Sequence, residues 1–260
     1  MSDYALLEGR LSVGASALSM SVAENGGGAV AVAVLAASTN YWPYSTTSLL
    51  TTIGTNLTAS ALAGTYTLSM SASTGKVTIS VSGGAVTSFA VTWTNTTLRD
   101  YLGFTGNLSG STSYLATAQC PLVWLPNQRR SEPQVPEGYV GMPIMDTSMV
   151  LSPSGHSRSI HWATRYGNTL AFRYLAGNKT WRALESTANE SLQSFFETCI
   201  GPGWPVRYHH DRDDAATYVE WRLMPKWEVK PEIPGFVGRG STGASTYWSY
   251  GPVEAIKLVE

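Results

Sequence analysis

Charged side chains are scarce in the first half of this 260-residue chain. Residues 1–125 carry seven of them, and residues 126–260 carry the other 28. The seven are Asp3, Glu8, Arg10, Glu24, Lys76, Arg99 and Asp100. A free globular domain usually has about a quarter of its positions charged. Because net charge keeps proteins apart, a neutral surface rich in Ser, Thr, Gly, Ala and Asn is poorly protected against self-association. The imbalance therefore indicates a first half that neighbouring subunits cover.

Basic excess, cysteine and long apolar runs are also lacking. The net charge of −1 argues against a general binder of nucleic acids or membrane surfaces. Cys120 and Cys199 show no metal or redox spacing, and their apolar surroundings predict buried free thiols without disulfides. The N-terminus lacks a secretory signal, and the apolar stretch 29–37 is too short to span a bilayer. We expect synthesis in a cytoplasm and no membrane insertion.

The first half alternates apolar and polar residues, which is typical of strands. We predict a hairpin from 18–22 and 29–34, followed by strands over 66–71, 77–81 and 88–94. One helix interrupts the series. Ser45 or Thr46 can cap it, and Leu50, Ile53 and Leu57 then share one face. A second short helix is predicted from about 95–97 to Leu102, before Gly103.

Three prolines in residues 126–138 indicate an extended linker, and charge density rises at the same place. Beyond it, one strong helix is predicted over 187–200. Thr187 and Glu190 form a capping box for it. Its buried stripe is Leu192, Phe195, Phe196 and Cys199. Strands are predicted over 144–151, 157–165, 169–174, 206–209, 218–224, 247–250 and 253–259.

These patterns predict a mainly β protein with a few short helices, of the α+β class. We expect two β-rich domains with antiparallel, sandwich-like sheets, over residues 1–125 and 139–260, joined by the linker 126–138.

The densest polar cluster runs from His209 to Asp214. Its residue types suit a metal, but adjacent strand residues point to opposite faces, and the spacing fails that of a calcium loop. Between two strands, the run is most simply a solvated hairpin tip that faces solvent or a lumen. The residues of this predicted tip are His209, His210, Asp211, Asp213 and Asp214. We find no catalytic, cofactor-binding or metal-binding set, because Ser154, His156 and His161 lack a nucleophile elbow or a shared strand face.

Aromatic and apolar residues give the candidate interface positions. Leu102 and Phe104 flank Gly103, and two interpretations stay open: a hydrophobic plug that closes the small sheet, or a loop presented to a neighbouring subunit. Trp42 and Trp248 lie in the aromatic runs Tyr-Trp-Pro-Tyr and Tyr-Trp-Ser-Tyr. Such residues can anchor an interface or stack on sugar rings.

Two stretches give the chain a resemblance to a known class of proteins. Helix, short strands and then Leu-Arg-Asp-Tyr-Leu-Gly-Phe-Thr-Gly over 98–106 resembles a small domain in structural proteins of tailed phages. The second half resembles phage tail proteins of the distal-tail, baseplate and tail-tube kind. The residues that carry this second likeness are Leu192-Gln-Ser-Phe195-Phe196, Gly201-Pro-Gly203-Trp204, Arg207-Tyr208, Asp211 and Tyr218-Val-Glu-Trp221-Arg-Leu223. The likeness covers about 45–115 and 140–225, and it transfers no functional residue.

The resemblance implies a non-enzymatic virion protein, made in the host cytoplasm, that forms an oligomeric ring in the tail or tail tip. Its partners would be copies of itself and other tail proteins, and it would need no cofactor. The alternative is a carbohydrate- or receptor-binding β-domain of a fibre or decoration protein, whose partner would be a host-surface glycan.

Overall fold

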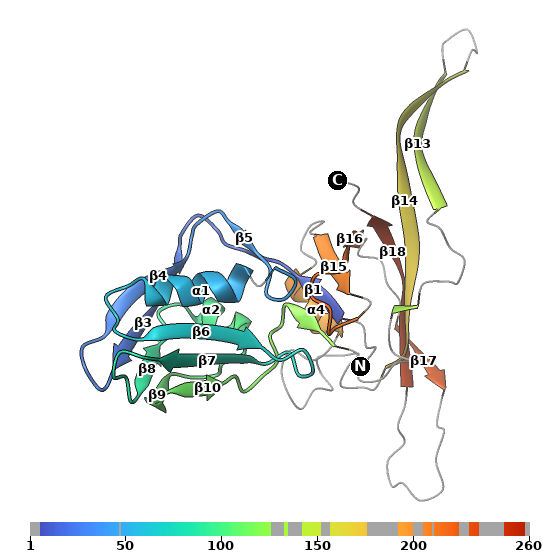
Figure 1. Ribbon diagram of the computed structural model, residues 1–260. Helices are drawn as coiled ribbons and strands as arrows, with labels where there is room; N and C mark the ends of the chain where they lie inside the picture. Colours follow the sequence, from blue (N-terminus) through green and yellow to red (C-terminus); the bar gives the residue numbers. More distant parts are fainter. Residues whose placement is uncertain are drawn as a thin grey trace, which may run out of the picture.

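Two antiparallel sheets from the first half of the chain face each other as a sandwich (Figure 1). The computed structural model describes residues 6–46, 48–125, 133–134, 142–151, 157–175, 192–199, 205–209, 211–223, 229–233 and 247–257. Side chains are described for 6–46, 48–125, 195–199, 205–209 and 211–222. The predicted fold class is confirmed, because the chain is mainly β with antiparallel sheets and short helices.

One sheet of the sandwich has four strands in the order β4-β3-β8-β9. These strands are β3 (Leu18–Glu24), β4 (Val30–Leu35), β8 (Phe89–Thr92) and β9 (Leu108–Ser111). The predicted hairpin is β3–β4, with Met20 opposite Val32 and Val22 opposite Val30. Met20 and Val22 are fully buried, because every second residue of a strand faces the same side.

The facing sheet has three strands in the order β10-β7-β6. They are β6 (Thr65–Met70), β7 (Val77–Ser82) and β10 (Ser113–Leu115). Val77, Ile79 and Val81 of β7 point into the core, as the alternation predicts. Thr78 and Ser80 lie on the outer face instead.

Helix α1 (Ser48–Thr58) closes the sandwich along one side, between the edge strands β4 and β6. Its buried face includes Leu50, Ile53 and Leu57, as the spacing predicts. The Asn56 Nδ2 donates to the carbonyl oxygen of Val34 in β4 at 2.9 Å, and Thr58 Oγ1 accepts from the Tyr66 N–H of β6 at 2.9 Å. The helix therefore bonds to both sheets.

Helix α2 (Thr96–Tyr101) forms as predicted. The Asn95 side chain caps it by accepting a hydrogen bond from the Leu98 N–H at 3.0 Å. Helix α1, in contrast, begins at Ser48, later than a cap at Ser45 or Thr46 predicts.

A nine-stranded sheet contains most strands of the second half, in the order β11-β1-β15-β16-β18-β14-β12, with β13 on β14 and β17 on β18. Its strands are β1 (Leu6–Gly9), β11 (Val123–Trp124), β12 (Pro133–Gln134), β13 (Met142–Leu151), β14 (Ser157–Leu175), β15 (Pro205–His209), β16 (Val219–Leu223), β17 (Val229–Ile233) and β18 (Tyr247–Lys257). A further short pair, β2 (Leu11–Ser12) and β5 (Asn40–Tyr41), lies outside this sheet.

The sheet includes strands from both halves of the chain. Strand β1 pairs with β11 on one side and with β15 on the other. Residues 6–9 and 123–124 of the first half therefore share a sheet with residues 205–209 of the second half. The predicted domain boundary and capping box stay predictions. Apart from 133–134, the linker 126–138 lies outside the described residues, as do Thr187 and Glu190.

Helix α4 (Leu192–Cys199) follows the predicted apolar stripe. Phe195 and Phe196 are each 1% exposed, and Cys199 is fully buried. A Cβ at Gly9 of β1 would collide with the Cys199 side chain, so the missing side chain lets β1 and α4 approach closely. Both predicted thiols are thus buried, and burial raises the pKa of Cys120 to about 12.

Glu24, at the end of β3, holds the loop before β6 in place through hydrogen bonds. Its carboxylate accepts hydrogen bonds from Ala63 N–H at 2.8 Å, Gly64 N–H at 2.9 Å and the Tyr66 hydroxyl at 2.9 Å. Burial raises the pKa of Glu24, but these hydrogen bonds together outweigh burial and hold the pKa below its usual 4.5.

We predict that Glu24→Gln lowers the free energy of unfolding at pH 7 by about 1 kcal/mol, after allowance for solvent screening. A depressed folded pKa stabilises the protein above the unfolded pKa, and this contribution disappears as pH falls through the folded value. The cost of the substitution should therefore shrink with acidification. Urea unfolding of both proteins at pH 7 and near pH 3.5 measures it, and an equal cost at both pH values would contradict the predicted role.

Candidate functional site

A row of charged residues crosses three neighbouring strands of the large sheet. Glu8 of β1 lies opposite Arg207 of β15, and Arg207 lies opposite Glu220 of β16. On the same face, Leu6 lies opposite His209. Glu8 and His209 are both 0% exposed and Arg207 is 9% exposed, so this polar row is largely buried.

The Glu8 carboxyl group connects three segments. Oε1 accepts hydrogen bonds from the Tyr44 N–H at 2.5 Å and the Ser45 N–H at 2.8 Å. Oε2 lies 3.2 Å from Nε2 of His209. One side chain of the first strand therefore accepts from two backbone N–H groups and contacts an imidazole that follows it by about two hundred residues.

His209 is surrounded by polar and aromatic groups. Its Nδ1 lies 3.4 Å from the Asp214 carbonyl oxygen, which can only accept, so Nδ1 is the donor. The Tyr44 ring meets the imidazole edge-on at 5.3 Å between centroids, and the Tyr44 hydroxyl donates to the Arg212 carbonyl oxygen. Burial, followed by nearby Asp213 and Glu8, raises the pKa of Tyr44.

Arg207 is held by both charge and aromatic faces. Its Nε donates to Glu220 Oε2 at 3.2 Å, and Nη1 donates to the Ser45 hydroxyl. The guanidinium carbon lies 3.9 Å from the Trp42 ring centroid and 4.2 Å from that of Tyr218. Such cation–π contacts stabilise a cation most when it is desolvated.

We call Glu8, Tyr44, Ser45, Arg207 and His209 the junction cluster. It fixes the 42–45 segment of the first half onto strands of the second half. Substrate cannot reach its carboxyl and imidazole groups in this conformation, because both are 0% exposed. Each group of the cluster depends on its neighbours for hydrogen-bond partners, so the cluster holds the segments that carry it in one geometry. The arrangement therefore suits a rigid structural joint.

The placement of His209 at the solvated tip is wrong. Strand alternation turns His209 to the same buried face as Arg207, and β15 includes it as its last residue. Sequence reasoning also passed over Glu8 as a site residue. The pattern that could have indicated a buried Glu8 is a single carboxylate between two leucines and a glycine, in a half of the chain with few charges.

The acidic residues after His209 do lie in the loop between β15 and β16. Asp213 and Asp214 are exposed and Asp211 is half-buried, whereas His210 lies outside the described residues. The Asp214 carboxylate accepts from the Ala216 and Thr217 N–H groups, and the hydrogen bonds from Thr217 and Ala216 lower its pKa. The Asp211 carboxylate likewise accepts from the Asp213 N–H at 2.9 Å, so the side chains of Asp211 and Asp214 cap their own turn. Across the described ranges, no three His, Cys, Asp or Glu side chains are grouped to hold a metal ion.

Leu102 and Phe104 do not present an interface. They are 0% and 3% exposed, and Phe104 stacks on Trp93 at 5.5 Å between centroids. Gly103 between them has a φ of +78°, and a Cβ there would collide with the Ala118 carbonyl oxygen. Of the two interpretations, the structure supports the hydrophobic plug.

The structure describes the side chain of only one of the two tryptophans proposed as interface positions. Trp42 is half-buried, and the Arg207 guanidinium lies over its ring. Trp248 belongs to β18, where its backbone pairs with Leu175 and Pro231, but its side chain lies outside the described residues.

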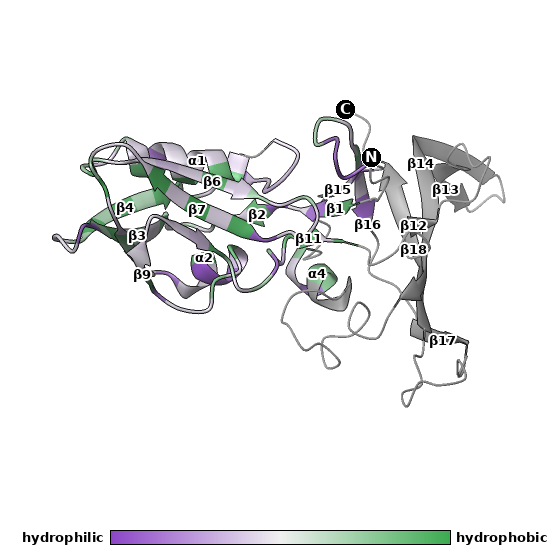
Figure 2. Cartoon of the chain, turned by 60° about the horizontal axis from the view of Figure 1, so that its bottom comes forward, coloured by the Kyte–Doolittle hydropathy of each residue, from purple (hydrophilic) through white to green (hydrophobic). Residues whose placement is uncertain are grey.

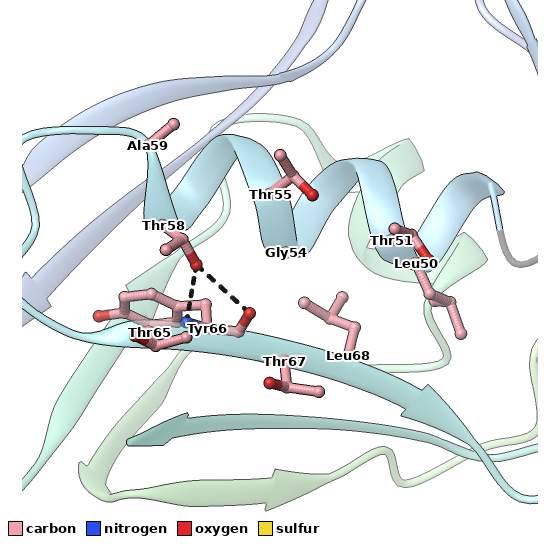
Figure 3. Close-up of a pocket in the computed structure, with 10 residues that line it drawn as sticks. All are labelled: Leu50, Thr51, Gly54, Thr55, Thr58, Ala59, Thr65, Tyr66, Thr67 and Leu68. Atoms are coloured by element: carbon pink, nitrogen blue, oxygen red, sulfur yellow. Dashed lines mark hydrogen bonds between the residues drawn. The ribbon is translucent and has the colours of Figure 1, made fainter. Parts of the chain in front are cut away.

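A cavity of about 450 Å³ lies between α1 and the edge strand β6 (Figure 3). Half of its lining residues are threonines, and the others are small, apolar or aromatic; the lining is Leu50, Thr51, Gly54, Thr55, Thr58, Ala59, Thr65, Tyr66, Thr67 and Leu68. The cavity contains no ionisable group other than the Tyr66 phenol. We call it the α1–β6 groove.

No family model matches this chain, and a search of curated proteins finds no match either. Among the described residues, no helix is both long and apolar enough to cross a membrane. A functional assignment therefore depends on the surfaces and strand edges of the molecule itself.

Proposed function

We propose that this chain is a non-enzymatic structural protein of a tailed-phage virion, assembled as a ring in the tail or tail tip. The likeness of residues 98–106 and 192–223 to tail proteins motivates the proposal. The observation that carries it is a long two-stranded ribbon formed by β13 and the first part of β14.

Among the strands that the structure describes, the two strands of the ribbon pair with each other and have no neighbour on their outer edges. Strands β13 and β14 pair over ten positions, from Met142–Gly167 to Leu151–Ser157. Strand β14 meets β18 only from Gly167 onward, and β12 only at 171–172. Among the described strands, neither strand of the ribbon pairs with anything else over 143–166.

An isolated two-stranded ribbon is at best marginally stable in water, and open strand edges favour pairing with another chain. An interface with a neighbouring subunit would cover both edges. A ring needs such a contact to be repeated around an axis. The ribbon is therefore the part of the chain best suited to reach the next subunit.

The sandwich supports the same proposal through its neutral outer faces. On the three-stranded sheet, the outward residues of β6 and β7 are Thr65, Thr67, Ser69, Thr78, Ser80 and Ser82. Figure 2 shows this part of the chain mostly in pale and green tones, with purple at α2. Identical copies can approach these faces without like-charge repulsion.

A shortened ribbon tests the proposal. Met142 and Gly167 are cross-strand partners, so replacing 143–166 with Asn-Gly should join them by a two-residue hairpin turn. We predict that this variant folds, with an unchanged sandwich, and loses self-assembly. Light scattering after size exclusion and circular dichroism measure the two properties.

The matched control keeps the ribbon and changes only its connection. Replacing 152–156 with Asn-Gly joins the partners Leu151 and Ser157, and this variant should assemble like the parent. If the variant without the ribbon assembles as well as the parent, the ribbon is not the contact between subunits.

The position of Arg207 argues against sugar binding at Trp42, one of the two tryptophans of the carbohydrate-binding alternative. A sugar needs a free face of the indole, and the Arg207 guanidinium lies over the Trp42 ring at 3.9 Å. A glycan array with Trp42→Ala and Trp248→Ala variants separates the two functions, because only the alternative predicts sugar binding that either substitution removes.

A further inference from the structure

We propose that Asn25 is a site of spontaneous covalent modification, where its carboxamide deamidates and thereby releases the loop over 83–88. Asn25 and Gly26 begin the connection between β3 and β4, and both are exposed. No other Asn of the 260-residue sequence is followed by Gly. The site lies in the sandwich, apart from the ribbon, so the modification does not depend on assembly.

Asn25 and Gly26 are the central residues of a tight turn. The Gly27 N–H donates to the Glu24 carbonyl oxygen at 2.8 Å, and φ is +52° at Asn25 and +72° at Gly26. A positive φ at both central positions defines a type I′ turn, for which Asn-Gly is a preferred sequence. A Cβ at Gly26 would meet nothing within 4 Å, so the space beside this residue is open.

The Asn25 carboxamide holds the neighbouring loop through both of its ends. Oδ1 accepts hydrogen bonds from the Thr87 N–H at 2.8 Å, the Thr87 hydroxyl at 3.0 Å and the Ser88 N–H at 3.2 Å. Nδ2 donates to the Ala85 carbonyl oxygen at 3.2 Å. One side-chain amide therefore serves as acceptor and as donor for residues of the same loop.

The backbone conformation of this loop explains why it needs such support. Gly83, Gly84 and Ala85 have successive φ values of +73°, +60° and +55°. Glycine adopts this left-handed region freely, but the Cβ of alanine makes it unfavourable. The hydrogen bond to the Ala85 carbonyl oxygen helps to hold that residue in place, and it depends on the amide nitrogen of Asn25.

The reaction joins the Asn25 side chain to the backbone nitrogen of Gly26. That nitrogen attacks Cγ of Asn25: a C–N bond forms, the Cγ–Nδ2 bond breaks, and Nδ2 leaves as ammonia with the proton of the Gly26 N–H. Water then opens the five-membered imide at either carbonyl carbon and yields aspartate or isoaspartate. Water is the only co-reactant, and no oxidation or reduction takes place. Glycine favours ring closure because it has no side chain to obstruct the attack.

The fold controls when this reaction can occur. Ring closure requires rotation about the Cα–C bond of Asn25, so that the Gly26 nitrogen approaches the side chain. The left-handed turn holds that nitrogen on the opposite side, while the carboxamide faces Thr87 and Ser88. The turn and the loop must therefore open together, and local openings of exposed loops occur more often than global unfolding.

Either product weakens the attachment of the loop. Both lose the donor to Ala85 and gain a negative charge next to Glu24. Isoaspartate also adds a carbon atom to the main chain inside a tight turn, so the N–H groups of Thr87 and Ser88 lose an acceptor in the right place. Modification at Asn25 therefore releases the loop over 83–88.

Peptide mass mapping of the full chain, after long incubation at mildly alkaline pH, tests the proposal. The peptide that contains Asn25 should gain the mass of an NH₂ group exchanged for OH, more slowly in the folded chain than in the chain unfolded in urea. Thr87→Val removes the hydroxyl donor to Oδ1 and should raise the rate in the folded chain about fivefold. The matched control is Thr67→Val, an exposed position on β6, which should leave the rate unchanged.

Two further measurements test the site and the effect on the loop. Asn25→Ser should abolish the mass gain in this peptide, and the modified fraction, isolated by ion exchange, should melt at a lower temperature than the parent. An Asn25 that stays intact in the folded chain, while the chain in urea is converted, would overturn the proposal. Equal rates for Thr87→Val and the parent, both folded by circular dichroism, would overturn the control of the reaction by the loop.

Discussion

Replacing Phe195 with alanine is expected to lower the free energy of unfolding by about 3–5 kcal/mol. Phe195 is 1% exposed, and its ring lies 5.8 Å from that of Phe196 in the same core. Truncation removes most of a buried aromatic side chain and leaves a cavity that the strands cannot collapse to fill. Urea unfolding followed by tryptophan fluorescence measures the loss.

The position of α4 explains why the effect should be global. The helix packs on β11, and Cys199 at its end contacts β1 through Gly9 and lies 3.8 Å from the Pro121 carbonyl oxygen. The matched control is Glu197→Ala on the exposed side of the helix, which should change stability by less than about 1 kcal/mol. Equal unfolding midpoints for Phe195→Ala and the parent would show that the helix does not anchor this core.

Replacing Glu8 with alanine should cost about 3–5 kcal/mol, because it removes one member of a buried polar cluster. The substitution leaves the Tyr44 and Ser45 N–H groups without their acceptor and leaves His209 without its carboxyl partner. Each buried donor that loses its partner carries a desolvation penalty. Urea unfolding at pH 7 measures the total.

Glu8→Gln and a double-mutant cycle with His209→Ala separate packing from polar contacts in the junction cluster. Glu8→Gln keeps an acceptor of the same size, and we expect it to cost less, about 1–3 kcal/mol. In a His209→Ala background, Glu8→Ala should cost less than in the parent, because the two side chains interact directly. Additive costs in this cycle would contradict the pairing.

The elements that local patterns predict well are those whose signals lie within a few residues. The strand β7 follows from the alternation of Val77, Ile79 and Val81, and α2 lies within the short helix predicted from about 95–97 to Leu102. The first residues of α1 differ, because Ser45 uses its N–H and hydroxyl for Glu8 and Arg207 instead of capping the helix. Tertiary contacts override the local preference there.

The long strands show a second limit of local patterns. We predicted two strands, 157–165 and 169–174, where the chain forms the single strand β14. Gly167 and Asn168 suggest a turn, but at this point β14 changes partners, from β13 to β18, without ending. Pairing with distant strands supplies the backbone hydrogen bonds that a short sequence window cannot reveal.

The candidate site was the least predictable part. Glu8 and His209 are separated by 201 positions, and the register of β1 on β15 brings them together. The residues adjacent to Glu8 or to His209 in the sequence do not predict that register. Burial of Leu102 and Phe104 was one of two open interpretations, since a Leu-Gly-Phe turn can close its own sheet or face a neighbour.

Assembly into a ring is the central claim, and the mass of the unaltered chain in solution tests it most directly. Light scattering coupled to size exclusion, over a wide range of protein concentration, should give a discrete mass that is an integer multiple of 27.9 kDa. Electron micrographs of that fraction should show closed particles. A mass of 27.9 kDa at every concentration, with or without other tail proteins, would contradict the claim.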